Sequence, residues 1–369
     1  MNFPGTDAIT HRTVSRRDFV RGGLGMSLSL TLLGNAACTA SAPASASAAT
    51  VVPPQRARGD AWTSVRDHGA RGDGVHDDTA AFRRAIDSLP DDGGTVEVPA
   101  GTYVIDPTRR TSLRSRMHLK LAPDAQLTAK PNAQERSFVL MAALVDDVEI
   151  SGGRILGDRD VHLGSTGEWG HGIALYGARR VTVRDIHVSR CWGDGIGIGG
   201  KRVGGRRSKN FPSPCEDVVL SGVTCTGNRR QGLTIGHSRD VRVHDSEFSH
   251  TGGTAPQAGI DIEPDAPGNA LRVHIENCRM NNNRGCGIQI YKRSNGVTIR
   301  DCTIEDNGAF GVLAVGTTNG LIVDNLIRRN GQKGIALRDT ATNYQASRNS
   351  LSDNRLRRRK RPGSGTRDE

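Results

Sequence analysis

Along most of this chain, apolar residues alternate with small or polar residues in short runs that return at a regular spacing. The recurring phrase is an Asn, three variable residues and a Gly, followed by apolar, variable and apolar positions, as in NRRQGLTI and NGQKGIAL. The glycines of the full or partial phrase are Gly172, Gly195, Gly232, Gly259, Gly287, Gly311 and Gly334. A period of about 25 residues built from short strands, with no helical periodicity, is typical of a β-solenoid. The pattern therefore predicts an all-β stack of coils.

Each coil is expected to supply one strand after its glycine and a second strand in a segment such as VTVRDI or VRVHDS. In stacked coils, equivalent side chains of neighbouring strands lie about 4.8 Å apart and form columns. The asparagines of the phrase are therefore expected to hydrogen-bond to one another at a turn. Cys278 and Cys302 stand at the same step of consecutive coils and are predicted to stack in the core. Cys191 and Cys215 flank the widest gap and form a candidate disulfide.

The segment before the coils has a different pattern, with one helix between short strands. In DHGARGDGVHDDTAAFRRAID the spacing predicts an amphipathic helix capped by Asp78 or Thr79, after a Gly-rich turn. One helix laid across the first coil would cover its open end. Asp73, Asp77 and Asp78 are explained by turn formation and helix capping, so we do not expect catalysis there.

From Val65 to Ile105 this segment, with GGTVEVPAGTY after the helix, resembles the N-terminal segment of the pectate-lyase-like superfamily. That superfamily includes rhamnogalacturonases, mannuronan epimerases and phage tailspikes. The resemblance implies a single-stranded right-handed parallel β-helix, here of roughly ten coils with an N-terminal capping helix, that acts on a polysaccharide. It is specific for the fold and does not specify the chemistry.

The first 49 residues do not share the repeat and read as a targeting segment. Arg16 and Arg17 precede a short apolar run and a stretch of Ala and Ser, which together resemble a twin-arginine export signal with cleavage near residues 45–48. The apolar run is shorter than the ~20 residues of a membrane-spanning helix. We therefore expect a periplasmic or extracellular protein without membrane insertion, and lipidation at Cys38 stays open.

The basic charge of the chain is concentrated at its C-terminal end. The formal net charge is +11, and residues 355–369 alone hold seven Lys and Arg against Asp368 and Glu369. This tail has no apolar periodicity and is predicted to be disordered, which leaves residues 50–354 as the β-helix domain. The aromatic content of 4% leaves few rings on which bases could stack, so no nucleic-acid partner is predicted.

One coil breaks the pattern at the positions that face outward. In AGIDIEPD, Asp261, Glu263 and Asp265 follow one another on the outer face, where other coils carry small residues such as Gly197 and Gly236. Residues two apart on a strand have Cα atoms ~6.6–6.8 Å apart, and side-chain reach brings their carboxyl groups to the separations that glycosidases use. We predict Asp261 and Glu263 as an acid–base pair. The alternative is a solvated polar face.

Neighbouring coils place further candidates beside this pair. His237 is predicted to join the acid–base chemistry. Asp194 is a second acidic candidate, and the alternative for it is a role in shaping a turn. Trp169 and Trp192 offer aromatic faces to a sugar ring, and the basic excursion GKRVGGRRSKNFPSPC is expected to wall a groove. The residues predicted to bind substrate are Asp265, Tyr291, Lys292, Asp194, Trp192 and Gln289.

The catalytic phrases of the superfamily are not reproduced in this chain. Against the epimerase phrase, it carries Ala258 in place of an aromatic residue and Cys286 in place of an aspartate. The GHG phrase of polygalacturonases occurs only at residues 170–172, upstream of every candidate acid, and reads as a chance match. The phrases of calcium pectate lyases are absent, so calcium is unsupported and no cofactor is predicted.

Together these features predict an exported enzyme that cleaves a uronate-containing polysaccharide, as a hydrolase or a lyase, or modifies it by carboxylate acid–base chemistry. An epimerase is the less favoured modifying activity. The alternative is a non-catalytic glycan-binding or envelope-binding β-solenoid, in which the acidic strand and the basic tail serve as docking surfaces.

Overall fold

The computed structural model describes residues 52–204 and 211–355. Contacts divide the chain into residues 1–49 and residues 50–369, and the described residues belong to the second unit. The predicted export signal and nearly all of the predicted basic tail lie outside the described residues. No helix in the described ranges is long and apolar enough to cross a membrane.

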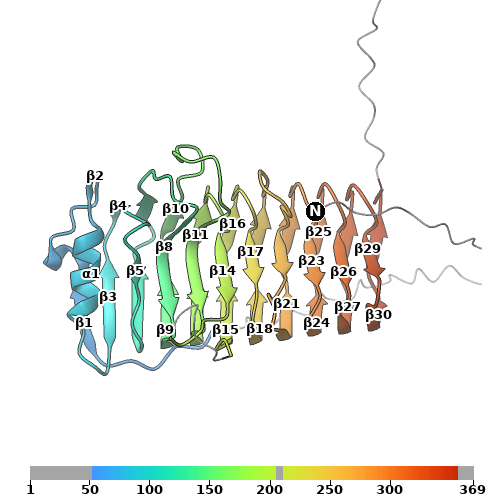
Figure 1. Ribbon diagram of the computed structural model, residues 1–369, viewed down its shortest axis with the longest axis horizontal. Helices are drawn as coiled ribbons and strands as arrows, with labels where there is room; N and C mark the ends of the chain where they lie inside the picture. Colours follow the sequence, from blue (N-terminus) through green and yellow to red (C-terminus); the bar gives the residue numbers. More distant parts are fainter. Residues whose placement is uncertain (1–51, 205–210, 356–369) are drawn as a thin grey trace, which may run out of the picture. The chain divides into compact units, whose positions relative to one another are not determined.

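Three sheets wind around a common core, and successive strands of the chain pass from one sheet to the next (Figure 1). Sheet A has 11 strands: β1 (Ala61–Ser64), β3 (Gly94–Val98), β6 (Met117–Leu121), β9 (Asp146–Ser151), β12 (Arg179–Arg184), β15 (Cys215–Ser221), β18 (Ser238–His244), β21 (Ala270–Glu276), β24 (Ser294–Arg300), β27 (Thr318–Val323) and β30 (Thr342–Ser347). Sheet B also has 11 strands: β2 (Asp73–Asp77), β4 (Gly101–Ile105), β7 (Ala125–Ala129), β10 (Arg154–Leu156), β13 (His187–Ser189), β16 (Thr224–Thr226), β19 (Glu247–Ser249), β22 (Arg279–Asn281), β25 (Thr303–Glu305), β28 (Leu326–Arg328) and β31 (Ser350–Ser352). Sheet C has nine strands: β5 (Thr111–Ser112), β8 (Arg136–Ala143), β11 (Trp169–Tyr176), β14 (Ile196–Gly199), β17 (Leu233–Ile235), β20 (Ile260–Ile262), β23 (Ile288–Tyr291), β26 (Val312–Val315) and β29 (Ile335–Arg338).

Neighbouring strands within each sheet are parallel, as β11 is with β14 and β14 with β17. The predicted parallel β-helix is therefore confirmed, with 11 strands in two of its sheets where roughly ten coils were expected. The predicted columns are also present. Gly197, Thr234, Asp261 and Gln289 are register partners in successive strands of sheet C.

The core is filled by the apolar residues on either side of each variable position. Ile196, Leu233, Ile260 and Ile288 are fully buried and stack in register along sheet C. Burial of each such side chain contributes roughly 1.5–3 kcal/mol relative to leaving it exposed. The alternating phrase therefore turns one face inward and leaves every second residue for the surface.

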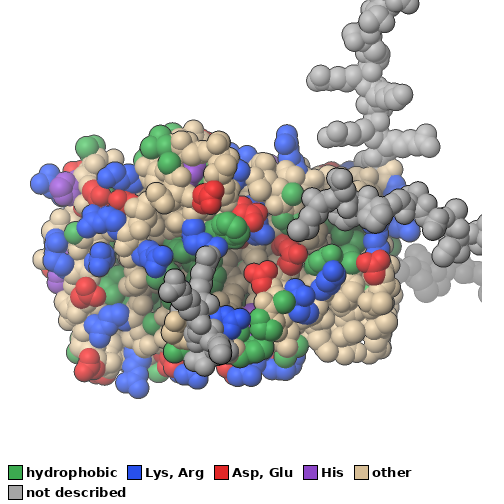
Figure 2. Space-filling model, in the orientation of Figure 1, with side chains coloured by type: hydrophobic (Ala, Val, Ile, Leu, Met, Phe, Trp, Pro, Cys, Tyr) green, Lys and Arg blue, Asp and Glu red, His purple; other side chains and the backbone are tan. Residues whose placement is uncertain are grey.

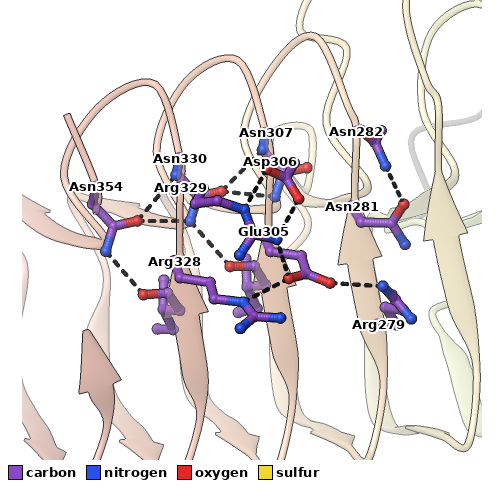
Figure 3. Close-up of polar contacts among 12 residues, drawn as sticks. Arg279, Asn281, Asn282, Glu305, Asp306, Asn307, Arg328, Arg329, Asn330 and Asn354 are labelled. Carbon is purple, nitrogen blue, oxygen red and sulfur yellow. Dashed lines mark hydrogen bonds and ion pairs between the residues drawn. The ribbon is translucent and has the colours of Figure 1, made fainter. Parts of the chain in front are cut away.

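The regular spacing of the asparagines builds a ladder at one turn of the coils. Asn283, Asn307 and Asn330 each donate from Nδ2 to Oδ1 of the next asparagine in the column, ending at Asn354, at 2.9 Å in every case. Figure 3 shows the part of this ladder from Asn307 through Asn330 to Asn354. The same Oδ1 atoms accept backbone N–H groups at 3.1–3.2 Å. The predicted hydrogen bonding along the stack is therefore confirmed.

The N-terminal end of the stack is covered by the helix α1 (Thr79–Asp87), which follows the 3₁₀ turn η1 (Val65–His68) (Figure 1). Its apolar face is buried, and Phe82 packs edge-on against Tyr103 at 5.4 Å. Asp78 is the N-cap residue, as expected, but its carboxylate accepts the backbone N–H groups of the preceding turn. Asp77 instead accepts the backbone N–H of Thr79 at 3.1 Å.

The predicted disulfide between Cys191 and Cys215 is wrong. Every cysteine in the described residues is a free, buried thiol. Cys215 Sγ lies 3.3 Å from the carbonyl oxygens of Leu175 and Gly199, so this thiol is packed inside the coil and does not reach across the excursion. Cys278 and Cys302 are core residues with 2% and 1% exposure, as predicted.

Candidate functional site

A cavity of about 650 Å³ opens on the outer face of sheet C. Figure 2 shows this face and a hollow near its centre, with basic and acidic side chains around it. The sequence produces the hollow, because both outward positions of β14 are glycines, Gly197 and Gly199, and Gly236 follows on the next coil. These residues leave the backbone bare between the side chains of Tyr176 and Glu263, which also line the cavity.

Two loops wall the cavity, as expected for the basic excursion. Lys201 and Ser213 form an antiparallel bridge that closes the base of the excursion. The second wall is the turn from Asp265 to Gly268, closed by a 2.7 Å backbone hydrogen bond. His237 joins the walls: its Nδ1 accepts the backbone N–H of Asn269 at 3.0 Å, and its Nε2 lies 3.2 Å from the carbonyl oxygen of Pro212. Nδ1 also lies 2.9 Å from the carbonyl oxygen of Asn269. Both ring nitrogens are therefore committed to backbone groups.

Asp194 lies at the floor of the cavity and is 1% exposed. Arg230 donates from Nη1 to both carboxylate oxygens at 3.3 and 3.2 Å, and Thr234 Oγ1 donates to Oδ2 at 2.9 Å. Burial works against the charge of Arg230, but Asp194, Glu168 and Asp261 together raise its pKa above the ordinary value. The floor is therefore a fixed ion pair reinforced by a hydroxyl.

His171 is the residue of this site that sequence reasoning missed. It lines the cavity, and its Nδ1 lies 3.6 Å from Oδ2 of Asp194. The interpretation of the GHG phrase as a chance match gives this histidine no role. Alignment of Gly172 with Gly195 was the available signal, because it places His171 and Asp194 at the same step of consecutive coils, next to each other.

Asp261 points outward as predicted, but its carboxyl group is enclosed. Gln231 Nε2 donates to it at 2.7 Å and Gln289 Nε2 at 3.3 Å, from the coils on either side, and the residue is fully buried. Burial, and then the neighbouring charges of Glu263 and Asp194, hold its pKa well above the usual range, with Arg230 opposing. Asp261 therefore lies behind the cavity lining and not in it.

The remaining predicted residues divide into those on the cavity and those beyond it. Glu263 and Asp265 line it. The side-chain amide of Gln289 is engaged in its hydrogen bond to Asp261. Tyr291 and Lys292 lie on the next coil, outside the lining, where Lys292 Nζ stands 5.1 Å from the Tyr291 ring centroid.

Trp192 is covered on both faces, contrary to the predicted sugar contact. The Arg229 guanidinium carbon lies 3.7 Å from its ring centroid, and the His162 ring stacks on it at 4.0 Å with an interplanar angle of 14°. Two groups this close to one centroid must take opposite faces, since they would overlap on the same one. Trp169 does line the cavity, with the Arg136 guanidinium 4.7 Å from its ring.

The cavity lining carries more basic than acidic side chains. Five cations, Arg110, Arg136, Lys201, Arg202 and Arg230, face the three carboxylates Asp194, Glu263 and Asp265. No group of three or more potential metal ligands is present among the described residues. The lining is thus suited to an anionic ligand, with carboxylates available for proton transfer.

The fold and site define a right-handed parallel β-helix protein, and the family model described as a right handed beta helix region matches residues 266–366. A second model covers most of the coils. The chain belongs to the rhamnogalacturonase A/epimerase, pectate lyase-like family, whose model matches residues 62–313.

Individual relatives are more distant. The SPbeta prophage-derived uncharacterized protein YorA of Bacillus subtilis is 27% identical over 71% of this chain and 48% of its own length. The chain thus spans about half the length of the curated relatives it matches. Among solved structures, the A-module of the mannuronan C-5 epimerase AlgE6 of Azotobacter vinelandii has a TM-score of 0.57 at 18% identity, over 79% of this chain and 86% of that module. The Streptococcus pneumoniae surface adhesin PfbA has a TM-score of 0.55 at 17% identity, over 79% of this chain and 91% of its own. These two likenesses concern the fold.

Proposed function

We propose that this chain is an exported enzyme that cleaves an acidic, uronate-containing polysaccharide, as a hydrolase or a lyase, or modifies it, in the cavity on sheet C. The observation that carries the proposal is the meeting of three carboxylates and five cationic side chains in one cavity of about 650 Å³. Membership of the rhamnogalacturonase A/epimerase, pectate lyase-like family supports a carbohydrate substrate. A cation-rich lining favours a polyanion over a neutral glycan.

Within this proposal, Glu263 transfers the proton. Its carboxyl group lines the cavity and has no hydrogen-bond partner among the described residues, so it is free to meet a substrate oxygen or hydrogen. Asp194 is the second carboxylate at the reacting centre, oriented by Arg230 and Thr234. Asp261, enclosed behind them, accepts hydrogen bonds from Gln231 and Gln289 and so fixes these two side chains, and burial holds its pKa well above the usual range.

The proposal is tested with purified protein lacking residues 1–49 and a panel of uronate-containing and neutral polysaccharides, with and without calcium. Release of reducing ends without an unsaturated product indicates a hydrolase, and ultraviolet absorbance of an unsaturated uronide indicates a lyase. A change of sugar configuration by NMR without chain cleavage indicates an epimerase. If every polysaccharide is recovered unchanged, the enzymatic proposal is wrong.

Export is a separate part of the proposal. It rests on Arg16 and Arg17 and the apolar run that follows them. Replacing both arginines with lysine is expected to retain the protein inside the cytoplasm, as measured by cell fractionation. Unchanged export of that double variant would remove the twin-arginine assignment.

A second candidate function, glycan binding without chemical change, is favoured by one observation. Asp194 in the cavity lining and Asp261 behind it are 1% and 0% exposed, so both carboxyl groups are enclosed by protein. This candidate would be supported by a polysaccharide that binds to the wild type and is recovered chemically unaltered, and whose binding is lost in the Trp169→Ala variant.

A further inference from the structure

The imidazole of His171 is held at the cavity floor with one nitrogen free. The residue is 4% exposed and lines the cavity. Its Nδ1 accepts the backbone N–H of Asp194 at 3.0 Å. A nitrogen that accepts must carry the lone pair, so in the neutral ring the hydrogen is on Nε2. Among the described residues, Nε2 has no hydrogen-bond partner.

Packing fixes the direction of this free N–H group. The ring stacks on Phe138, its register partner in β8, with centroids 5.5 Å apart and planes 29° from parallel. On the next coil lies Gly197, where a Cβ would come within 3.1 Å of the ring carbon Cδ2 and 3.4 Å of Nε2. Because position 197 is a glycine, Nε2 faces the hollow over bare backbone rather than a side chain.

The charged groups around the ring decide its protonation. Burial lowers the pKa of His171, the nearby Asp194 raises it, and the cations Arg230 and Arg136 lower it again, for a net decrease. The imidazole is therefore neutral at neutral pH, so it is a hydrogen-bond donor at Nε2 and not a general acid.

We propose that His171 contacts the substrate by donating its Nε2–H to a sugar hydroxyl at the floor of the cavity, and that this hydroxyl in turn donates to Asp194. The inference rests on the proposed function and names the group that the floor recognises. A hydroxyl accepts and donates, as this pair of neighbours requires. A substrate carboxylate only accepts and would be repelled by Asp194, so its place is at the exposed cations Arg110 and Arg136 on the rim.

The tautomer is tested without any substrate. Nitrogen-15 NMR of the wild-type protein is expected to show His171 as the neutral Nε2–H tautomer throughout the neutral pH range. A ring that titrates near the ordinary histidine pKa, or that carries its hydrogen on Nδ1, would overturn the proposal.

Substrate contact is tested by calorimetry with the polysaccharide or oligosaccharide that the wild type binds or alters. His171→Asn, whose amide cannot reach the position of Nε2, is expected to weaken binding roughly three- to tenfold, as for loss of one hydrogen bond. His171→Gln, which can place a donor there, is expected to remain within about twofold of wild type. His250→Asn, at an exposed histidine that is absent from the cavity lining, is the matched control.

The outcomes separate the two proposals. If the wild type neither binds nor alters any polysaccharide, the proposed function fails. If the wild type binds and His171→Asn binds equally well, the function stands and the role of His171 is wrong. Should His171→Asn not fold, as judged by circular dichroism, the Nε2–H resonance of the wild type replaces it: a shift on sugar addition supports the contact, and no shift overturns it.

Discussion

At the scale of single residues, burial of His118 makes the stability of the molecule depend on pH. The residue is 3% exposed, with Nε2 2.7 Å from Ser151 Oγ and 3.7 Å from a Glu149 oxygen. Burial lowers its pKa from 6.5 to about 4, against the effect of Glu149 and with that of the cations Arg58 and Arg184. The unfolded chain therefore binds more protons than the folded one between these pH values.

Stability is consequently expected to fall as the pH drops from 6.5 to about 4, by about 3 kcal/mol from this group. His118→Gln should remove that part of the dependence, while His250→Gln, at an exposed position, should keep it. Urea unfolding across the pH range measures both. Equal slopes for wild type and His118→Gln would contradict the assignment.

The sequence alone predicts which residues are neighbours where the repeat fixes their register, and it does not predict contacts that depend on side-chain reach or on loops. The column of Gly197, Thr234, Asp261 and Gln289 follows from spacing alone, because stacked parallel strands keep their register. The enclosure of Asp261 does not, since it depends on how far glutamine side chains from two other coils reach. The covering of Trp192 does not follow from spacing either, because Arg229 stands at a variable position of the repeat phrase and His162 lies in a loop outside it.

At the scale of elements, the segment of residues 54–58 forms a strap across the outer face of sheet A. Arg56 is 7% exposed and donates to Thr182 Oγ1 at 2.8 Å and to Asp217 Oδ2 at 2.6 Å. Arg58 donates to Glu149 at 3.0 Å. The strap therefore connects β9, β12 and β15, which belong to three successive coils. Nothing in the periodicity predicts it, because the contacts join residues more than 90 positions apart.

Removing the strap's central contact should destabilise the fold. Arg56→Ala is expected to lower the free energy of unfolding by about 1–3 kcal/mol, because it leaves the buried partners of the guanidinium without a donor. Arg154→Ala, at an exposed arginine on β10, is expected to change it by less than about 0.5 kcal/mol. Urea denaturation compares the two, and equal midpoints would refute a stabilising role for the strap.

The asparagine ladder makes a second prediction at this scale. Asn307 is 2% exposed, donates to Met280 O and Asn330 Oδ1, and accepts from Asn283. Asn307→Ala is expected to cost about 2–4 kcal/mol, since several buried groups lose partners at once. The matched control is Asn295→Ala in the exposed asparagine row, for which a change below about 0.5 kcal/mol is expected. Thermal unfolding measures both variants, and equal melting temperatures for Asn307→Ala and Asn295→Ala would contradict a stabilising role for the ladder.

At the scale of the whole β-helix domain, repetition explains both the scaffold and the place of the site. Similar coils stack because each buries an apolar face against the next, and the candidate site lies where coils differ from the repeat. The cavity lies where the outward positions of one coil are the glycines Gly197 and Gly199 and where another coil carries the acidic residue Glu263. The repeat thus indicated the region of the cavity, and the sequence named Asp194 as a candidate in it, while the ion pair of Asp194 with Arg230 and the place of His171 needed the structure.

The central claim is that Glu263 performs acid–base chemistry on a uronate polysaccharide in this cavity. The most direct measurement is the initial rate of product formation by wild type, Glu263→Gln and Asp124→Asn on the polysaccharide that the panel identifies. Asp124 is exposed and absent from the cavity lining, so its variant controls for loss of a surface carboxylate. The account predicts a loss of at least about a hundredfold for Glu263→Gln and an unchanged rate for the control. A Glu263→Gln rate equal to wild type would contradict it.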